Sequence, residues 1–280
     1  GPGGRDHFFD SDGVKIHYQV MGAGEPVILN HGFAVNLGFQ WIAPKLADAL
    51  AKDFQLYLVD SRGHGRSDKP YSREQYGRKM VDDQIRLLDH LQIRKARFVG
   101  YSMGAMITAR LMTEHPDRVR CGVLGGAGPV RPDAAEDASS EELAQSLEQG
   151  KGFFPLLRNL NAVGRPAPTE KSVRPMNVMM SAMNDEKALA AVIRGFPEFA
   201  VDMQKLRDNK VPALILIGDR DPLKTRMVDP IVGRFGSLRV EVIPRGDHLD
   251  AFSNPRFLEV LRAFLKNPEA PAIAPSKDDG

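Results

Sequence analysis

The sequence predicts an α/β protein in which helices cover both faces of a mostly parallel β-sheet and a helical insertion interrupts the pattern. Two observations support this fold class. Short apolar segments, typical of buried strands, alternate with amphipathic segments, typical of helices, along most of the chain. The alternation stops between about residues 131 and 202, where the chain is charged, helical in pattern and interrupted by prolines. At 280 residues, one large domain with an insertion is the default expectation.

The individual elements follow from these patterns in chain order. The segment 15–20 alternates apolar and polar side chains and is predicted to form an antiparallel hairpin with Phe8 and Phe9. Apolar runs predict buried strands of a parallel sheet at 26–30, 54–59, 96–101, 119–124, 211–217 and 238–243. The amphipathic segments predict helices at 44–52, 72–91, 105–112, 225–234 and 254–266.

These elements define a domain organisation. Residues 5–130 and 203–267 are predicted to form the core domain, and residues 131–202 a helical cap over the sheet. Residues 1–4 resemble the remnant of a cleaved expression tag, and residues 268–280, rich in Pro, Ala and charge, are predicted to be disordered. We favour a cytoplasmic location, with a periplasmic or secreted one as the alternative if a leader was removed.

Composition excludes several classes of protein. With 38 basic and 36 acidic side chains the net charge is +2, which gives no electrostatic case for binding nucleic acid or an anionic membrane surface. No segment reaches the roughly 18 apolar residues of a membrane span. The single cysteine, Cys121, rules out an internal disulfide and is expected to be a buried hydrophobe. Because metal-ligand clusters and nucleotide-binding glycine loops are missing from the sequence, we expect no metal and no cofactor. The oligomeric state is left open.

A serine stands where a predicted strand gives way to a helix. The run Gly100-Tyr101-Ser102-Met103-Gly104 follows the strand at 96–101 and opens a helical segment. It is typical of a nucleophile elbow, a tight turn that strains the serine backbone and needs flanking glycines to avoid collisions. Five letters can match by chance, so the strand-turn-helix context carries the prediction. Ser102 is the predicted nucleophile.

A serine nucleophile needs a histidine base oriented by a carboxylate. Of the seven histidines only two follow the serine, and His115 lies several turns away along the elbow helix. His248 lies in a loop after a predicted strand, at the edge where the carboxyl ends of parallel strands meet. His248 is therefore the predicted base.

The same edge of the sheet offers two carboxylates. Asp219 and Asp221 directly follow the strand at 211–217. Asp221 is favoured as the acid because it lies further out in the loop and Pro222 stiffens the backbone behind it. Asp219 is then expected to cap the loop. The resulting order of serine, acid and histidine accompanies the elbow motif.

A tetrahedral intermediate also needs two N–H donors for its oxyanion. One is predicted to be the N–H of Met103, directly after the nucleophile. The other is predicted to be the N–H of Phe33, in a loop after the strand at 26–30 where Gly32 allows close backbone approach. His31 could be read as catalytic, but a structural role in shaping this turn is favoured.

Together these motifs carry a family resemblance. The chain resembles the α/β-hydrolase superfamily, in its capped esterase-like branch, from about Phe8 to Lys266. The motifs stand in that superfamily's order: 31–32, the turn 60–67, the elbow at 100–104, 218–221 and 246–248. The resemblance implies an α/β-hydrolase fold with an eight-stranded sheet and the cap described above. It also implies that the turn 60–67 is structural, with no direct role for His64.

The resemblance and the serine nucleophile favour hydrolysis of a small to medium, largely apolar carboxylic ester. Relatives that act on haloalkanes or epoxides carry aspartate at the nucleophile position. Methionines at helical spacing in the cap, 176, 179, 180 and 183, could bind substrate, although packing of the cap on the sheet is favoured. The substrate-binding candidates are His31, Tyr101, Phe153, Phe154, Met180 and Leu249. The alternatives are a C–C bond hydrolase of ring-cleavage products, a cofactor-free perhydrolase and a non-catalytic small-molecule receptor.

Overall fold

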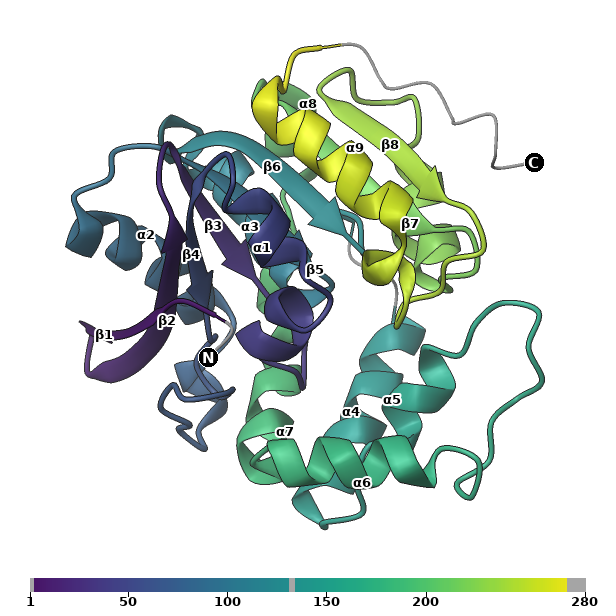
Figure 1. The fold of residues 1–280 in the computed structure, drawn as a ribbon. Coiled ribbons are helices and arrows are strands. Elements are labelled where there is room, and N and C mark those ends of the chain that lie inside the picture. Colours follow the sequence, from purple (N-terminus) through teal and green to yellow (C-terminus); the bar gives the residue numbers. More distant parts are fainter. Residues whose placement is uncertain (1–2, 131–133, 271–280) are drawn as a thin grey trace.

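The computed structural model describes residues 3–130 and 134–270 and is built on an eight-stranded sheet in the order β1-β2-β4-β3-β5-β6-β7-β8 (Figure 1). β1 (Arg5–Ser11) and β2 (Val14–Gly22) form the predicted antiparallel hairpin, and β2 also pairs antiparallel with β4 (Gln55–Val59). All other neighbours are parallel: β3 (Pro26–Asn30), β5 (Ala96–Tyr101), β6 (Val119–Gly125), β7 (Ala213–Gly218) and β8 (Leu238–Ile243). The predicted fold class is confirmed.

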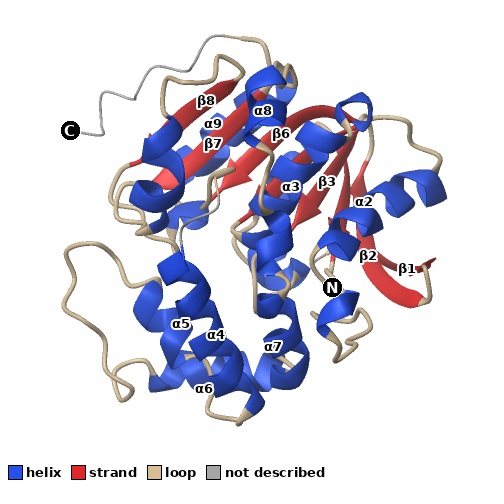
Figure 2. Ribbon diagram, turned by 180° about the vertical axis from the view of Figure 1, so that it is seen from behind, coloured by secondary structure: helices blue, strands red, loops and turns tan. Residues whose placement is uncertain are grey.

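Helices cover both faces of this sheet. α1 (Leu46–Leu50) and α9 (Pro255–Lys266) lie on one face, and α2 (Arg78–Leu91), α3 (Met103–Glu114) and α8 (Met203–Asp208) lie on the other (Figures 1 and 2). Two apolar cores result, one on each side of the strands. Cys121 on β6 is fully buried, and burial raises the pKa of its thiol to about 12, as expected for an inert core residue.

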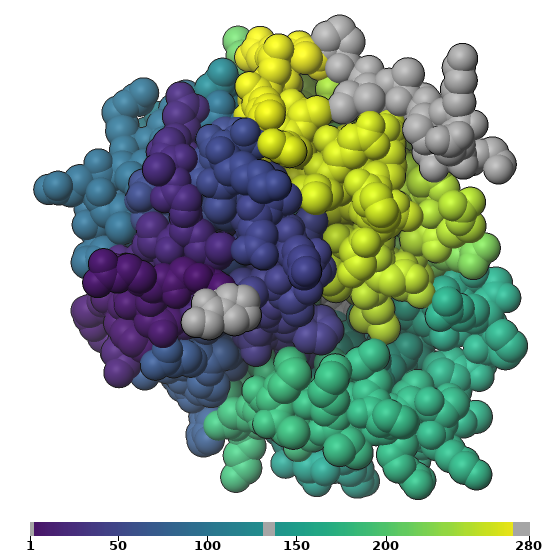
Figure 3. All heavy atoms as spheres, in the orientation of Figure 1, coloured from purple at the N-terminus to yellow at the C-terminus, as the bar shows by residue number. Residues whose placement is uncertain are grey.

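A helical insertion separates β6 from α8. It contains α4 (Ala134–Glu148), α5 (Phe154–Asn159), α6 (Arg174–Met183) and α7 (Glu186–Arg194), and no strand occurs in its described part. These helices gather beyond the carboxyl ends of the parallel strands (Figure 1). In the space-filling view the insertion, coloured teal to green, lies against the lower end of the core (Figure 3).

Three predicted helices differ from those observed. The helix predicted at 72–91 begins only at Arg78, because Gly77 adopts φ +63° after a short 3-10 turn. The helix predicted at 44–52 shrinks to Leu46–Leu50, because Lys45 has a left-handed backbone at φ +65°. The segment predicted as a helix at 225–234 instead forms a π turn and a 3-10 turn, in which Pro230 cannot donate a backbone hydrogen bond.

The two ends of the chain fall partly outside the described residues. Residues 1–2 of the suggested tag remnant and residues 271–280 of the predicted disordered tail lie outside them, as do residues 131–133 at the start of the predicted cap. Residues 267–270 form a turn, and Ala270 accepts a hydrogen bond from Arg239 at 2.9 Å. None of the helices in the described ranges is both long and apolar enough to cross a bilayer.

The junction of β5 and α3 leaves no space for side chains at the two elbow glycines. A β-carbon on Gly104 would collide with the carbonyl oxygen of Asn30, and one on Gly100 would collide with the carbonyl oxygen of Gly104. Ser102 between them has φ +55°, the left-handed region that residues other than glycine rarely adopt. The elbow glycines are therefore required by close backbone contact, as the motif predicts.

Gly104→Ala is expected to lower the free energy of unfolding by about 3 kcal/mol or more, because backbone atoms of β3 cannot move aside. Urea denaturation followed by circular dichroism measures this loss. Gly236→Ala is the matched control, since a β-carbon there meets nothing within 4 Å and its change should stay within about 0.5 kcal/mol. Equal stability of the two variants would contradict the packing argument.

Candidate active site

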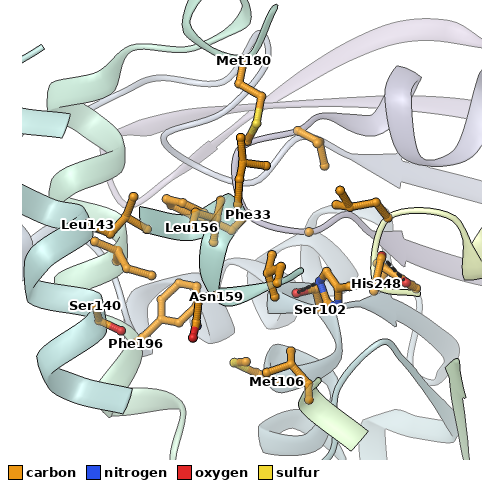
Figure 4. Close-up of a pocket in the computed structure, with 18 of the residues that line it drawn as sticks. Phe33, Ser102, Met106, Ser140, Leu143, Leu156, Asn159, Met180, Phe196 and His248 are labelled. Atoms are coloured by element: carbon orange, nitrogen blue, oxygen red, sulfur yellow. Dashed lines mark hydrogen bonds between the residues drawn. The ribbon is translucent and has the colours of Figure 1, made fainter. Parts of the chain in front are cut away.

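Three side chains from separate loops form a chain of hydrogen bonds at the carboxyl edge of the sheet. His248 Nε2 lies 3.0 Å from Ser102 Oγ (Figure 4). His248 Nδ1 lies 2.8 Å from Asp221 Oδ2. His248 and Asp221 are only 4% and 1% exposed, so the pair is shielded from water. The structure thus brings together the serine, histidine and acid that the sequence singled out.

The two neighbouring aspartates are clearly distinguished. Asp221 Oδ1 accepts a hydrogen bond from the Leu223 N–H at 2.9 Å, which leaves Oδ2 directed at His248. Asp219 is exposed, and its carboxylate accepts no hydrogen bond from the described residues, so the expected loop-capping role is not seen. The carboxylate partner of His248 is Asp221.

Backbone contacts hold the acid loop against the histidine loop. Gly218, at the end of β7, lies so close to Gly246 that a β-carbon would collide with the Gly246 carbonyl oxygen. That oxygen accepts a hydrogen bond from the Arg220 N–H at 2.9 Å. The Tyr101 hydroxyl, at the end of β5, donates to the carbonyl oxygen of His248 at 2.6 Å. Burial raises the pKa of Tyr101 well above its usual value, so this hydroxyl keeps its proton and remains a donor.

Two backbone N–H groups near Ser102 fit the predicted oxyanion donors. Met103 is the first residue of α3, where N–H groups have no partner within the helix and the helix dipole favours negative charge. Phe33 follows Gly32 in the loop after β3, and its side chain lines the cavity (Figure 4). Neither N–H donates to an acceptor in the described part of the chain.

Two buried histidines join the Phe33 loop to the loop after β4. His31 Nδ1 donates to the Gly32 carbonyl oxygen at 2.7 Å, and its Nε2 accepts from the Ser61 N–H at 3.1 Å. His64 Nε2 accepts from the Ala34 N–H at 3.1 Å in return. Burial lowers the pKa of His31, and it also lowers the pKa of His64, to about 3. Both rings are therefore neutral and can accept these bonds.

The buried carboxylate of Asp60 joins the same two loops through hydrogen bonds. Asp60 accepts from the N–H groups of Leu37 and Arg66, both at 3.0 Å, and lies 2.7 Å from His17 Nδ1. Although burial opposes it, hydrogen bonds to Asp60 and Asp6 raise the pKa of His17 above its usual value. The turn 60–67 therefore organises the loops around the site, and none of its residues is among those that line the cavity at Ser102.

Ser102 and His248 open into a cavity of about 180 Å³ between the core and the insertion (Figure 4). No Asp, Glu, Lys or Arg occurs among its described lining residues, and most of them are apolar. Ser140 and Leu143 reach it from α4, Met180 from α6 and Phe196 from the chain after α7. All four methionines of α6 line it as well: Met176, Met179, Met180 and Met183.

The predicted substrate-binding residues divide into two groups. Tyr101, Met180 and Leu249 line the cavity, whereas His31, Phe153 and Phe154 do not. Phe153 is fully buried inside the insertion, and the ring of Phe154 lies under the guanidinium of Arg158, 5.6 Å away. Sequence reasoning missed Gln40 and Phe196, which do line the cavity. In the described ranges no group of three or more His, Cys, Asp or Glu side chains could hold a metal ion.

This fold and site define a class of α/β protein in which the sheet presents a serine on a strained turn. The serine lies beside a histidine that is hydrogen-bonded to a carboxylate. The chain belongs to the α/β-hydrolase fold family, whose model matches residues 25–255.

Individual relatives agree with this assignment. The chain is 28% identical to a non-heme chloroperoxidase of Kitasatospora aureofaciens, over 75% of this chain and 79% of that protein. It is also 28% identical to the pimeloyl-[acyl-carrier protein] methyl ester esterase of Vibrio cholerae, over 75% and 81%. A thermophilic esterase from Thermogutta terrifontis shares the fold with a TM-score of 0.76 at 19% identity, over 95% of this chain and all of that one.

Asp221→Asn is expected to lower kcat for ester hydrolysis roughly 1,000-fold or more, because an amide at this position favours the wrong histidine tautomer. Asp219→Asn, two residues away and exposed, is the matched control and should change kcat less than about twofold. Steady-state kinetics on a 4-nitrophenyl ester, with thermal melts to confirm folding, make the comparison. Equal losses in both variants would contradict the assignment of Asp221.

Proposed function

We propose that this protein is a serine hydrolase that cleaves an uncharged, largely apolar carboxylic ester through an acyl-enzyme intermediate. The observation that carries the proposal is the chain of hydrogen bonds from Asp221 through His248 to Ser102, opening into an apolar cavity. Membership of the α/β-hydrolase fold family supports a hydrolase, and the esterases among its relatives support cleavage of an ester bond.

In the proposed mechanism Ser102 Oγ attacks the ester carbonyl carbon while His248 Nε2 takes its proton. Asp221 holds the imidazole in the tautomer with Nδ1 protonated and stabilises the imidazolium that forms. The N–H groups of Phe33 and Met103 donate to the oxyanion of the tetrahedral intermediate. His248 then returns the proton to the leaving alcohol, and the same residues activate a water that releases the acid.

The cavity walls support the proposed substrate class. Methionine side chains from α6 are flexible and polarisable and adapt to alkyl or aromatic groups. A volume of about 180 Å³ suits a small to medium ester. Because the described lining carries no Asp, Glu, Lys or Arg side chain, an anionic group on the substrate would lose its hydration without gaining a partner.

The nucleophile is tested directly with a fluorophosphonate probe. We expect one phosphonyl group on Ser102, located by peptide mass spectrometry, and no labelling of Ser102→Ala, which should also lose ester hydrolysis by a factor of about 10³ or more. Heat-unfolded protein controls for non-specific labelling. An unlabelled but folded wild-type protein would contradict the proposal and favour a receptor.

The substrate class is tested with one ester in two charge states. We expect 4-nitrophenyl methyl adipate to be hydrolysed with a kcat/KM about 100-fold above that of the free acid, 4-nitrophenyl hydrogen adipate, because the described lining residues offer the carboxylate no cationic partner. The two differ only in the methyl group that removes the charge. A preference for the free acid would overturn the uncharged substrate class while leaving the serine mechanism intact.

A further inference from the structure

Gln40 places an amide at the wall of the cavity. It lies on the π turn Gly38–Ile42 that follows the Phe33 loop, and its side chain lines the cavity while being only 2% exposed. Its Oε1 accepts a hydrogen bond from the Gly32 N–H at 3.1 Å. This bond fixes the orientation of the amide, because an N–H needs an acceptor and would repel the NH₂ group.

The other half of the amide lacks a partner. Gln40 Nε2 is buried and donates to no acceptor in the described part of the chain. Among the described residues that hold a buried side-chain nitrogen or oxygen without a hydrogen-bond partner, Gln40 is the one that lines the cavity. Buried amide donors cost free energy unless an acceptor meets them, so such a group beside a binding site points to an acceptor on the ligand.

The amide also lies next to the reacting centre. Ser102 Cβ and Gln40 Oε1 both lie within 3.5 Å of the point where a β-carbon on Gly32 would stand. Gln40 therefore borders the space in which the carbonyl group attacked by Ser102 must sit. The N–H groups of Phe33 and Met103 serve the oxyanion, which leaves Gln40 Nε2 for a second oxygen of the substrate.

We infer that Gln40 is a specificity-determining residue whose Nε2 donates a hydrogen bond to an uncharged acceptor oxygen close to the scissile carbonyl. The inference rests on the proposed ester hydrolysis and narrows its substrate class. The preferred esters carry an ether, keto or hydroxyl oxygen near the reacting carbonyl, within an otherwise apolar acyl group. Plain alkyl esters leave the amide unsatisfied and are poorer substrates.

A matched pair of esters tests this donor. 4-Nitrophenyl methoxyacetate and 4-nitrophenyl butyrate differ by one ether oxygen in place of a methylene. The ratio of their kcat/KM values is compared between wild type, Gln40→Glu and Gln40→Met. At alkaline pH, where the new carboxylate is ionised, Gln40→Glu keeps the acceptor for the Gly32 N–H but lacks the donor, whereas Gln40→Met lacks both. Comparing ratios cancels the different intrinsic reactivity of the two esters.

We expect the methoxyacetate-to-butyrate ratio to fall about tenfold in both variants, as loss of one neutral hydrogen bond predicts. A role confined to holding Gly32, or to stabilising the oxyanion, would lower both rates by the same factor. An unchanged ratio in both variants would therefore overturn the inference, even if overall activity dropped.

A binding measurement separates this inference from the proposed function. Ser102→Ala and Ser102→Ala/Gln40→Met are titrated with ethyl methoxyacetate and ethyl butyrate by ligand-observed NMR. Loss of the methoxyacetate preference on adding Gln40→Met supports the donor, even if wild-type protein hydrolyses neither ester and the proposed hydrolysis fails. An equal preference in both variants overturns the inference, whatever the esterase assays show.

Discussion

Close backbone packing at the turn between β5 and α3 is the constraint on which the site depends. Ser102 has φ +55°, and the two elbow glycines touch backbone atoms that exclude any side chain. The Ser102 N–H donates to the carbonyl oxygen of Gly125 at 2.7 Å, so the strained turn is anchored to the neighbouring strand β6. Because α3 starts at this turn, the same contacts that strain the serine also place the N–H of Met103 beside it.

The remaining parts of the site are held by hydrogen bonds between neighbouring loops. Gly218 and Gly246 let the acid and histidine loops touch backbone to backbone, which fixes Asp221 relative to His248. The neutral rings of His31 and His64 play the equivalent role for the Phe33 loop, each accepting an N–H from the other's loop. A site built this way is positioned before substrate arrives, and such preorganisation is what electrostatic stabilisation of a transition state requires.

How much could be predicted from sequence depended on whether the signal was local. Apolar runs located the strands, and the Ser102 turn, His248 and Asp221 followed from chain order and the meeting of parallel strands at one edge. Helix starts at Arg78 and Leu46 were missed because positive φ values at Gly77 and Lys45 depend on tertiary packing. The insertion was harder, since nothing in its sequence tells which face of a short helix meets the cavity. Gln40 carried a weak signal, because it is a polar residue in an apolar segment after the Phe33 loop.

Chemistry and specificity are assigned to different parts of the molecule. Core loops supply every group proposed to act on the reacting carbonyl, whereas the insertion supplies much of the cavity wall. The loop after α5 meets the site through the Val163 N–H, which donates to the Arg220 carbonyl oxygen, and through Arg165, which pairs with Asp247 at 3.4 Å. Because Arg165 is largely exposed, this ion pair contributes little stability. The insertion therefore contacts the neighbours of Asp221 and His248, whereas the hydrogen bonds that join Ser102, His248 and Asp221 run between core loops. Gln40 is the exception among the specificity groups. It lies on the core beside the Phe33 loop, close to the position proposed for the reacting carbonyl group.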